Sequence, residues 1–431
     1  MRSKVPRIYL LVFSLTFSMV IFHYVTLVSA KPNLPVRNID TGFDYTTIQE
    51  AIDASETLDG HTIFVRNGRY YERVVLRKDL SLIGEDKNTT IIDANGNGPV
   101  IRIENISYSR VSGFTIRNSG RWYSHLTFPE STGIYVVNSR GVVLDRNIVK
   151  TTEYGIYFAN SSNSVVYNNM LTANDDYDIY LHQSNSITVC GNSILDSLGR
   201  SGILVKSSVH NIIDRNTISL GFGNAITLED SYENIVESNW LSDKSWDGID
   251  LYKSCNNIIV GNTIENNWRG IILHDARDNK IYHNSLIDNK DTTGIMRQIV
   301  IYGSNNTNIW DDSLGKGSYW SDYGGQDLDN DGIGDVPYVI DQENQDNYPL
   351  MNPSIIPPKK MQSLYYELLS SYDYLQTNYN NLRLEQEHII NELNTIRCLM
   401  YILMTTTIIF AVTTVYLIAR KPKVKPEVKT N

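Results

Sequence analysis

The chain has 431 residues, of which 41% are hydrophobic, so it is long enough to bury a sizeable core. The formal net charge is -10, but the sequence between residues 30 and 399 has 30 basic and 47 acidic residues, a net charge of -17. Binding to phosphate backbones requires a basic surface, so this composition excludes duplex nucleic acid as a partner. The three cysteines do not form a disulfide framework.

The first 30 residues have the pattern of a secretory signal peptide. Three basic residues precede an apolar run that ends in the small residues Val28, Ser29 and Ala30. This order predicts export followed by cleavage, and the length of the run leaves an uncleaved N-terminal anchor open. Both interpretations place the main domain outside the membrane.

A short helix is expected near the start of the main domain, residues 31–317. In YTTIQEAIDASE, Ile48, Ala51 and Ile52 are spaced to form one apolar helix face. We expect this helix to cover the open end of the β structure that follows, which would otherwise expose unpaired strands. The next segments have strand-like alternation, and Gly113 stands where an asparagine recurs later in the chain.

A repeat of 22 to 24 residues then dominates the sequence. Each copy begins at an anchor position and has an asparagine fourteen residues later. The anchors are Gly133, Gly155, Asp178, Gly202, Ala225, Gly248 and Gly270, and the asparagines are Asn147, Asn169, Asn192, Asn216, Asn239, Asn262 and Asn284. A constant part followed by a part of variable length predicts a solenoid.

The residues inside each copy predict the kind of solenoid. Isoleucine follows every anchor and another apolar residue stands two positions further on, so each copy opens with a strand of alternating side chains. Serine stands six residues after the anchor in six copies, where the chain must turn. We therefore predict an all-β fold, a right-handed parallel β-helix of about 23 residues per coil. The asparagine column is interpreted as a ladder inside a turn, because Asn accepts the left-handed conformation and bonds to the backbone.

Outward positions of the first strand predict a binding groove. Aromatic and polar side chains alternate there over successive copies, which suits a sugar polymer lying along the groove. The alternative is that aromatic residues occur there because they favour strands. The candidate polysaccharide-binding residues are Tyr154, Tyr177, Tyr180, His182, Lys206, Trp246, Tyr252 and Trp268.

Three carboxylates of the same groove are candidate catalytic residues. Glu229 and Asp250 lie on neighbouring copies, with Asp247 nearby, and a pair of carboxyl groups is what glycoside hydrolysis requires. Lys206 stands one copy from Glu229 in the same column, so a surface ion pair is the simpler explanation. Copper would need soft ligands held together, whereas His182 and His274 stand four coils apart.

Residues 318–351 form the predicted closing segment of the solenoid. Its acidic run has oxygen-bearing side chains at alternate positions and a glycine for a tight turn, as in short calcium loops. We expect a structural Ca²⁺ there, with a solvated acidic turn as the alternative. The candidate ligands are Asp327, Asp329, Asp331 and Asp335.

These segments together resemble a known protein family. TIQEAIDA, HTIFVRNGRYYERVVL, LSLIGEDKNTTIID, the asparagine repeats and SYWSDYGGQDLDNDGIGDVPYVIDQENQDNYPLM are similar to NosD-like right-handed parallel β-helix proteins over about residues 40–351. That family is part of a wider set of carbohydrate-binding proteins and sugar hydrolases, and anchored members are typical of archaeal cell surfaces. The resemblance implies a surface or periplasmic location, with polysaccharide binding or metal-protein maturation, and provides no catalytic set.

The last part of the chain predicts a membrane-anchored stalk. A Pro-rich linker at 352–360 precedes heptads over 361–397, which favour a coiled coil and self-association, with a lone amphipathic helix as the alternative. Residues 399–419 are uncharged over the length of a membrane span, and the tail 420–431 is basic, which orients it toward the cytoplasm. Candidate glycosylation sites are Asn88, Asn105, Asn160 and Asn305.

From these features we expect a membrane-anchored extracellular protein that binds or organises surface polysaccharide without catalysis. A polysaccharide-modifying hydrolase, lyase or epimerase acting in the same groove is the alternative. A structural surface spacer or a NosD-like copper-maturation accessory is the third possibility.

Overall fold

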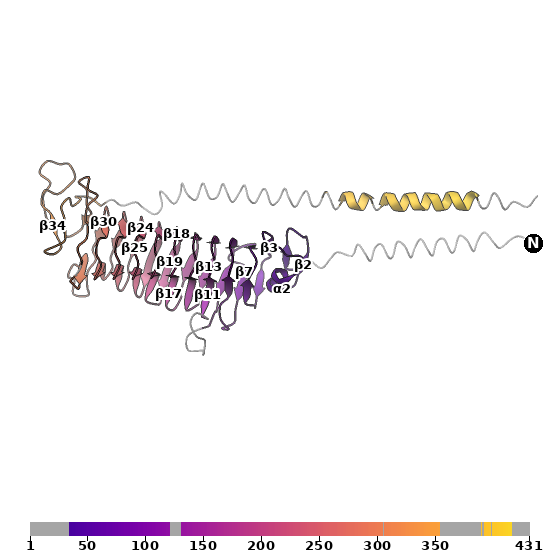
Figure 1. The fold of residues 1–431 in the computed structure, drawn as a ribbon, viewed down its shortest axis with the longest axis horizontal. Coiled ribbons are helices and arrows are strands. Elements are labelled where there is room, and N and C mark those ends of the chain that lie inside the picture. Colours follow the sequence, from indigo (N-terminus) through magenta and orange to yellow (C-terminus); the bar gives the residue numbers. More distant parts are fainter. Residues whose placement is uncertain are drawn as a thin grey trace, which may run out of the picture. The chain divides into compact units, whose positions relative to one another are not determined.

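A computed structural model describes residues 34–120, 131–304, 306–353, 389, 392–397 and 399–415. The chain divides into two compact units between Pro358 and Lys359. The first unit is a β-solenoid, shown edge-on in Figure 1. The predicted signal segment, the basic tail and most of the predicted linker and stalk lie outside the described residues.

Three long sheets run along the solenoid, and each coil contributes one strand to each of them. The strands pair in parallel except at the start, where β1 pairs with β2 and β3 antiparallel. Among the described residues the first sheet has twelve strands: β1 (Val36–Asn38), β2 (Asp44–Tyr45), β3 (Thr62–Val65), β6 (Ser81–Gly84), β9 (Ser109–Ser112), β12 (Val142–Asp145), β15 (Val165–Tyr167), β18 (Thr188–Cys190), β21 (Ile212–Asp214), β24 (Ile235–Glu237), β27 (Ile258–Val260) and β30 (Lys280–Tyr282).

The second sheet follows the first within each coil. In the described chain it has eleven strands: β4 (Gly68–Tyr70), β7 (Thr90–Asp93), β10 (Thr115–Arg117), β13 (Ile148–Lys150), β16 (Met170–Thr172), β19 (Ser193–Ser197), β22 (Thr217–Gly221), β25 (Trp240–Ser242), β28 (Thr263–Glu265), β31 (Ser285–Ile287) and β33 (Tyr319–Trp320). Strand β33 pairs in parallel with β31, so the predicted closing segment contributes a strand to the solenoid itself.

The third sheet contains the strands that open each repeat. Within the described ranges it has ten strands: β5 (Val74–Leu76), β8 (Ile101–Glu104), β11 (Thr132–Val137), β14 (Tyr154–Ala159), β17 (Tyr177–His182), β20 (Ser201–Lys206), β23 (Asn224–Glu229), β26 (Asp247–Tyr252), β29 (Arg269–His274) and β32 (Ile299–Tyr302). Their inward columns, such as Ile134 and Val136, are fully buried, which confirms the predicted alternation.

The anchor glycines are explained by the close stacking of successive coils. A side-chain carbon added to Gly155 would lie 2.4 Å from the carbonyl oxygen of Asp178 on the next coil. One added to Gly270 would lie 2.4 Å from the carbonyl oxygen of Gln298. No side chain fits at such distances, so glycine recurs at the start of the strand.

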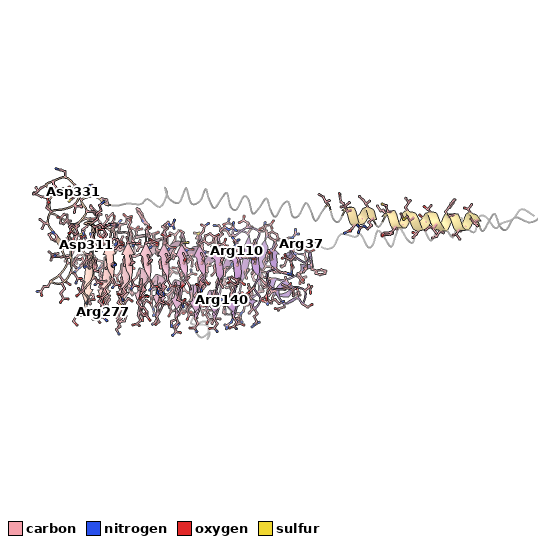
Figure 2. All side chains as sticks on the ribbon, turned by 45° about the horizontal axis from the view of Figure 1, so that its top comes forward. Arg37, Arg110, Arg140, Arg277, Asp311 and Asp331 are labelled. Carbon is pink, nitrogen blue, oxygen red and sulfur yellow. The ribbon has the colours of Figure 1, made fainter. Side chains whose placement is uncertain are left out.

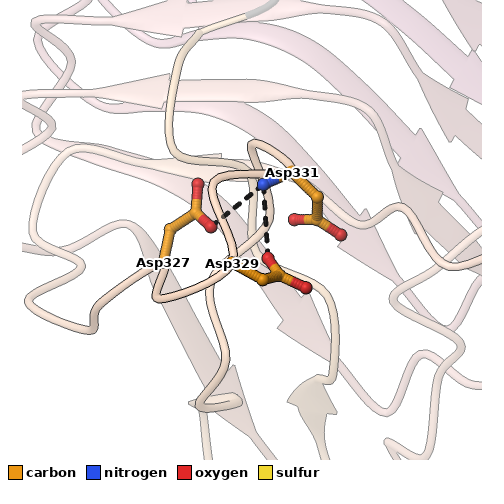
Figure 3. A group of neighbouring side chains, drawn as sticks. All are labelled: Asp327, Asp329 and Asp331. Carbon is orange, nitrogen blue, oxygen red and sulfur yellow. Dashed lines mark hydrogen bonds between the residues drawn. The ribbon is translucent and has the colours of Figure 1, made fainter.

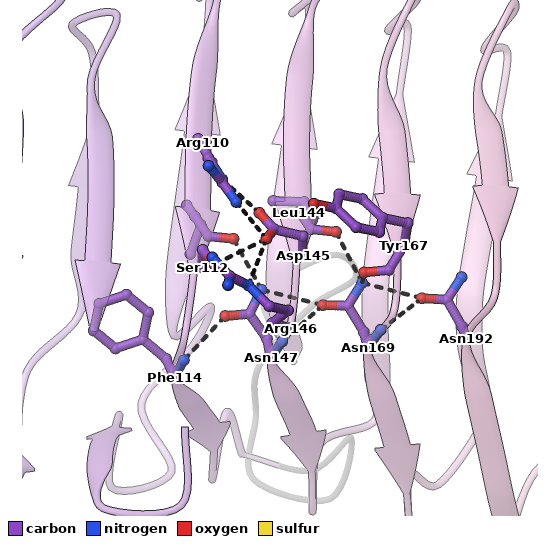
Figure 4. A network of polar contacts seen from close by, with 11 residues as sticks. Arg110, Ser112, Phe114, Leu144, Asp145, Arg146, Asn147, Tyr167, Asn169 and Asn192 are labelled. Carbon is purple, nitrogen blue, oxygen red and sulfur yellow. Dashed lines mark hydrogen bonds and ion pairs between the residues drawn. The ribbon is translucent and has the colours of Figure 1, made fainter. Parts of the chain in front are cut away.

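The asparagine ladder predicted from the sequence is present at the turn between the first and second sheets (Figure 4). Asn192 Oδ1 accepts a hydrogen bond from the backbone N–H of Asn169 at 2.9 Å, and Asn169 Nδ2 donates to the carbonyl oxygen of Leu144 at 2.8 Å. All seven predicted asparagines are buried and repeat this pattern. Each ladder residue thus satisfies backbone groups that the turn leaves unpaired.

Two details of the predicted turn were wrong. The left-handed backbone belongs to the residue before each ladder asparagine, for example Asn168 at φ 54°, and not to the asparagine itself. Gly113, at φ +83°, also occupies this left-handed position, because Asp145 pairs with Ser112 and so places Gly113 beside Arg146. Phe114 stands in the asparagine column, and its N–H donates to Asn147 Oδ1 at 3.1 Å.

Two further ladders stabilise the corner after the third sheet. The predicted serines form one ladder, in which the hydroxyl of Ser184 accepts from the N–H of Ser161 at 3.2 Å. A second asparagine ladder, which the sequence analysis missed, consists of Asn211, Asn234, Asn257, Asn279 and Asn308. Four of these asparagines stand nine residues after an anchor, so the signal was present in the repeat.

Both ends of the solenoid are covered. As predicted, helix α2 (Ile48–Asp53) buries Ile48, Ala51 and Ile52 against the first coils. It begins with a capping box of Thr47 and Glu50, which the sequence analysis did not identify. At the opposite end lies the closing segment, with a short antiparallel pair of β34 (Tyr338–Val339) and β35 (Gln345–Asp346). Figure 2 shows Arg37 and Asp331 at these two ends.

The second unit contains one helix, Glu392–Val415, among the described residues. It is long and apolar enough to cross a membrane, and it overlaps the predicted span 399–419. The predicted coiled coil over 361–397 lies mostly outside the described residues.

Candidate functional site

The outward side of the ten-stranded sheet carries the side chains that the sequence analysis identified. Strand pairing confirms the two outward columns expected from the repeat. The middle column is Tyr135, Tyr157, Tyr180, Leu204, Thr227, Asp250 and Ile272, and the strand-end column is Val137, Ala159, His182, Lys206, Glu229, Tyr252, His274 and Tyr302. The two halves of these columns differ in chemistry and in exposure.

The N-terminal half is a packed tyrosine cluster, which we call the tyrosine seam: Tyr135, Tyr154, Tyr157, Tyr177 and Tyr180. The ring of Tyr157 lies between those of Tyr135 and Tyr180, with centroids 5.2 and 4.7 Å away, and is only 2% exposed. Burial raises the pKa of Tyr157 and Tyr180 above the ordinary value. Tyr154 and Tyr180 are also buried, so the expectation that they line an open groove requires correction.

His182 borders this seam at the end of β17. Its Nδ1 lies 3.2 Å from the hydroxyl of Tyr157, and its ring centroid lies 5.8 Å from that of Tyr180. Burial and the charge of Lys206 lower the pKa of His182, so the imidazole is neutral near pH 7. His182 therefore completes the packed seam.

The C-terminal half begins where ion pairs replace the tyrosines. Lys206 Nζ lies 2.7 Å from Glu229 Oε1 across β20 and β23, as the shared column suggested. Asp247, which is buried, receives two hydrogen bonds from Arg269 on the next coil, at 2.5 and 3.0 Å. Two of the three candidate catalytic carboxylates are therefore engaged by a cation.

Asp250, the third candidate, has a different environment. Its Oδ2 accepts a hydrogen bond from Asn224 Nδ2 at 3.1 Å, while its buried Oδ1 has no hydrogen-bond partner within the described part of the chain. Burial and the charge of Asp247 raise the pKa of Asp250 to about 7, although Arg269 acts in the opposite direction. A largely buried carboxyl group with a raised pKa therefore lies in the middle of this half.

Exposed aromatic side chains border the C-terminal half on two sides. On the corner before the strands, Phe222, Trp246 and Trp268 follow one another over three coils, and the two tryptophans are 47% and 38% exposed. The backbone N–H of Trp268 donates to the backbone carbonyl oxygen of Trp246 at 2.9 Å. The two indole rings make no ring contact among the described residues. The guanidinium of Arg269 instead lies over the Trp268 ring, 4.6 Å from its centroid.

On the other border, the strand-end column continues with aromatic rings. Tyr252 and His274 have ring centroids 6.0 Å apart, and His274 stacks on Tyr302 at 4.9 Å. We call these two borders, with Thr227 and Asp250 between them, the aromatic face. Phe222, His274 and Tyr302 were not among the predicted site residues, although their columns were known from the repeat.

The acidic loop of the closing segment brings three of its four predicted ligands together (Figure 3). Carboxylate oxygens of Asp327, Asp329 and Asp331 lie within 4.8 Å of one another. The backbone N–H of Asp331 donates to both Asp327 and Asp329 at 3.2 Å. Asp335 lies outside this group, and its carboxylate accepts the N–H of Leu328 at 2.6 Å. Three carboxylates in a tight loop would supply part of the set of oxygen ligands that a calcium ion requires.

The predicted glycosylation sites lie at the surface where the structure describes them. Asn88, Asn105 and Asn160 are exposed, and the last two occupy corners with φ of 57° and 48°. Asn305 lies outside the described residues.

Curated proteins resemble short parts of this chain. A cell surface glycoprotein of Methanothermus fervidus is 31% identical over 116 residues, which cover 27% of this chain and 17% of that protein. A probable ABC transporter binding protein NosD of Pseudomonas aeruginosa is 41% identical over 81 residues, covering 19% and 17%. The matches span about one sixth of the length of these relatives.

Solved structures with a similar backbone fold include the mannuronan C-5 epimerase AlgE6 A-module of Azotobacter vinelandii. It is 18% identical with a TM-score of 0.44, and the match covers 61% of this chain and 92% of that chain. The Dettilon tailspike protein is 13% identical with a TM-score of 0.46, covering 57% and 63%.

A family profile described as the right handed beta helix region matches this chain over residues 59–198, 99–245, 132–286 and 201–313. The overlapping matches extend over more than half of the sequence, and they include the strands that carry the tyrosine seam and the aromatic face. The chain therefore belongs to the right-handed β-helix family.

Proposed function

We propose that this protein binds polysaccharide at a cell surface through the aromatic face, without catalysis. The observation that carries the proposal is the pair of borders formed by aromatic rings on successive coils, of which Phe222, Trp246, Trp268, Tyr252 and Tyr302 are exposed. Neighbouring strands are about 4.8 Å apart, so such borders offer a repeating set of apolar surfaces to a repeating polymer. Polar groups between the borders would form hydrogen bonds with sugar hydroxyls. In ligand sites, apolar side chains usually provide the contact area and a few polar groups fix the orientation of the ligand.

Binding is favoured over chemistry by the state of the carboxylates. Glycoside hydrolysis requires two carboxyl groups that are free to act on either side of a bond. Glu229 and Asp247 are held by Lys206 and Arg269 in close ion pairs, which leaves Asp250 alone. Lys206 and Glu229 then serve as hydrogen-bonding groups at the edge of the face.

A surface location accounts for the remaining features. The helix Glu392–Val415 would anchor the chain, with the solenoid outside and the basic tail inside. The relative named as a cell surface glycoprotein supports this location. We further propose that the heptads of 361–397 join several copies, since binding by linked sites multiplies weak affinities for a polymer.

The test is binding of the full-length chain, in detergent, to an array of neutral, acidic and amino-sugar glycans. Replacing both Trp246 and Trp268 with Ala should weaken binding of the best glycan at least about tenfold, since buried aromatic anchors contribute on the order of 1 kcal/mol or more each. Tyr232→Ala is the matched control, because Tyr232 is 49% exposed at another corner of the same coil. Unchanged binding in the folded double variant would contradict the proposal, and no binding to any glycan would favour a spacer.

A polysaccharide-modifying enzyme is the second candidate, and Asp250 is the observation that favours it. A carboxyl group with a pKa of about 7 has the property expected of a general acid or base. This candidate predicts that incubation of the best glycan with the protein releases shorter, unsaturated or epimerised product, and that Asp250→Asn abolishes it. Stable binding without any product separates the binder from the enzyme.

A further inference from the structure

The closing segment contains a cavity separate from the aromatic face. It has a volume of about 600 Å³, within the range of ligand-binding sites. Its walls come from two stretches, 322–328 and 335–339. Within the closing segment, 318–351, the sequence has eight acidic residues and no Lys or Arg, so the surroundings favour a positively charged occupant.

The walls of this cavity are fixed by contacts that involve its two tyrosines. The ring of Tyr338 stacks on the buried Trp320 with centroids 4.2 Å apart and planes 10° apart. The hydroxyl of Tyr323 donates to the carbonyl oxygen of Val336 at 2.6 Å. A site whose walls are already ordered loses little conformational entropy when it is filled.

The rim of the cavity is apolar and exposed. Leu328, Val336 and Val339 all line it, and they are 74%, 57% and 67% exposed. Three aliphatic side chains around one opening form a small apolar patch, which would gain free energy from being covered. A small free amine would leave this rim in water, whereas a polypeptide would cover it with the side chains that flank its basic residue.

The carboxylate of Asp322 selects the kind of basic group. Asp322 lines the cavity, and the hydroxyl of Tyr338 lies 3.2 Å from both of its oxygens. A hydroxyl in this bridging position occupies the direction that an arginine fork needs for bidentate binding. A lysine ammonium acts as a point charge and needs no such geometry. Asp335, from the second stretch that lines the cavity, adds a second acidic group.

We infer that this cavity docks a lysine side chain, flanked by aliphatic residues, from a partner protein. The ammonium group lies beside Asp322 and Asp335, and the flanking residues cover Leu328, Val336 and Val339. The site is independent of the aromatic face, which lies on the outer side of the ten-stranded sheet.

The experiment measures fluorescence anisotropy of a labelled peptide, Gly-Ile-Lys-Ile-Gly with uncharged ends, titrated with the full-length chain in detergent. We expect saturable binding, weakened at least about fivefold when the peptide lysine is replaced by Gln or by Arg. Asp322→Asn and Val339→Ser should weaken binding by a similar factor. Glu343→Gln removes one negative charge from the same segment outside the cavity and should leave binding within about twofold of the unmodified chain.

Four results would overturn the inference. No saturable binding excludes the site, and equal loss in Glu343→Gln and Asp322→Asn assigns binding to net charge. If the Arg peptide binds more strongly than the Lys peptide, the cavity does not prefer an ammonium group to a guanidinium group. Displacement of the peptide by cadaverine at equal concentration assigns the cavity to free amines. Because Val339 is exposed and Asn retains an acceptor for Tyr338, both variants are expected to fold, which melting curves verify.

Discussion

The tyrosine seam and the aromatic face lie along the same outward side of one sheet, yet the seam is buried and the rings of the face are largely exposed. Strands β14 and β26 have the same length and the same register with their neighbours. In the seam, the rings stack on one another and Tyr157 has almost no exposed surface. In the aromatic face, the rings stand at the borders, and the polar side chains of Thr227 and Asp250 lie between them. The backbone of the solenoid therefore determines the direction of each side chain, whereas the neighbouring side chains determine whether that side chain is exposed to solvent.

We expect the tyrosine seam to stabilise the fold and the aromatic face to bind the ligand. A buried ring that contacts two others contributes through its buried area and its stacking. An exposed ring contributes little to folding and is available to a ligand. Substitutions in the two halves should therefore separate folding from binding.

The largest expected effect is on stability, from Tyr157→Ala in the seam. Removing a fully buried aromatic ring leaves a cavity, so we expect the free energy of unfolding to fall by about 3 kcal/mol. Glycan binding by the folded protein should not change. Tyr252→Ala, at an exposed position in the aromatic face, should cost less than about 1 kcal/mol. Urea titration followed by circular dichroism measures both; equal losses would break the distinction between the halves.

The next effect concerns the ion pair that borders the aromatic face. Arg269→Ala leaves the buried carboxylate of Asp247 without its cation, which should cost about 2–3 kcal/mol because an uncompensated charge remains inside. Asp247→Asn together with Arg269→Ala should recover part of this loss. If the loss in the double variant equals the sum of the losses in Arg269→Ala and in Asp247→Asn alone, the pair contributes no coupling, and the two halves differ by packing alone.

Much of the fold follows from the repeat, because a side-chain period of two and a constant distance of fourteen residues leave one arrangement of strands and turn. The inward isoleucines, the ladder at Asn169 and the cap at Ile48 could all be predicted on this basis. The assignment of the left-handed position failed because asparagine itself accepts that conformation, which drew attention to the ladder residue. Gly191 and Gly261, which directly precede Asn192 and Asn262, are the sequence signal that the left-handed position comes one residue earlier.

The site could be predicted less well, since exposure depends on neighbours that are distant in sequence. Tyr180 was correctly placed on the outward side, and its own column contains Tyr157, one of the rings that bury it. The rings of Tyr154 and Tyr177, which stand at the start of their strands, complete the burial and could not be inferred from that column. The pairing of Asp247 with Arg269 could have been found, because both residues directly precede an anchor in successive copies. The pKa of Asp250 depends on burial, which no spacing reveals.

A smaller effect should appear in the pH dependence of stability. The folded-state pKa of Asp250 is raised to about 7, so the folded protein retains a proton that the unfolded chain loses above its ordinary pKa of 3.8. Stability therefore falls as pH rises from about 4 to 7 and is constant above. Asp247, Glu229 and Arg269 are the charged groups that act on Asp250.

Asp250→Asn removes this dependence and keeps an acceptor for Asn224. Because a partly exposed carboxyl group retains some hydration, we expect the variant to gain about 2 kcal/mol relative to the unmodified chain between about pH 4 and pH 8. Melting curves across this range measure the gain, with Asp230→Asn as the control. A constant difference at all pH values would show that Asp250 ionises normally, and that the middle of the aromatic face is as well hydrated as its borders.

The smallest expected effect is that of calcium on the stability of the closing segment, which follows the aromatic face along the chain. We propose that Asp327, Asp329 and Asp331 bind a structural calcium ion, because their oxygens converge within 4.8 Å in a loop that follows β33. Binding to the folded state alone adds about 1.4 kcal/mol at a calcium concentration tenfold above Kd. The tyrosine seam, several coils away, should not respond.

Calcium should therefore raise the melting temperature of the full-length chain by a few degrees, and a chelator should reverse the increase. Asp331→Asn keeps the acceptor for the N–H of Ile333, at 2.8 Å, but loses the charge, so it should abolish the calcium response without unfolding the loop. Glu343→Gln removes a charge from the same segment outside the loop and should leave the response intact. If Glu343→Gln weakens the response as much as Asp331→Asn does, calcium acts through the net charge of the segment. If no variant or chelator changes the melting temperature, the loop is a solvated acidic turn, and the closing segment is stabilised without a metal, by contacts such as the packing of Trp320 and the hydrogen bonds of Ser318 and Trp320 to Asp346.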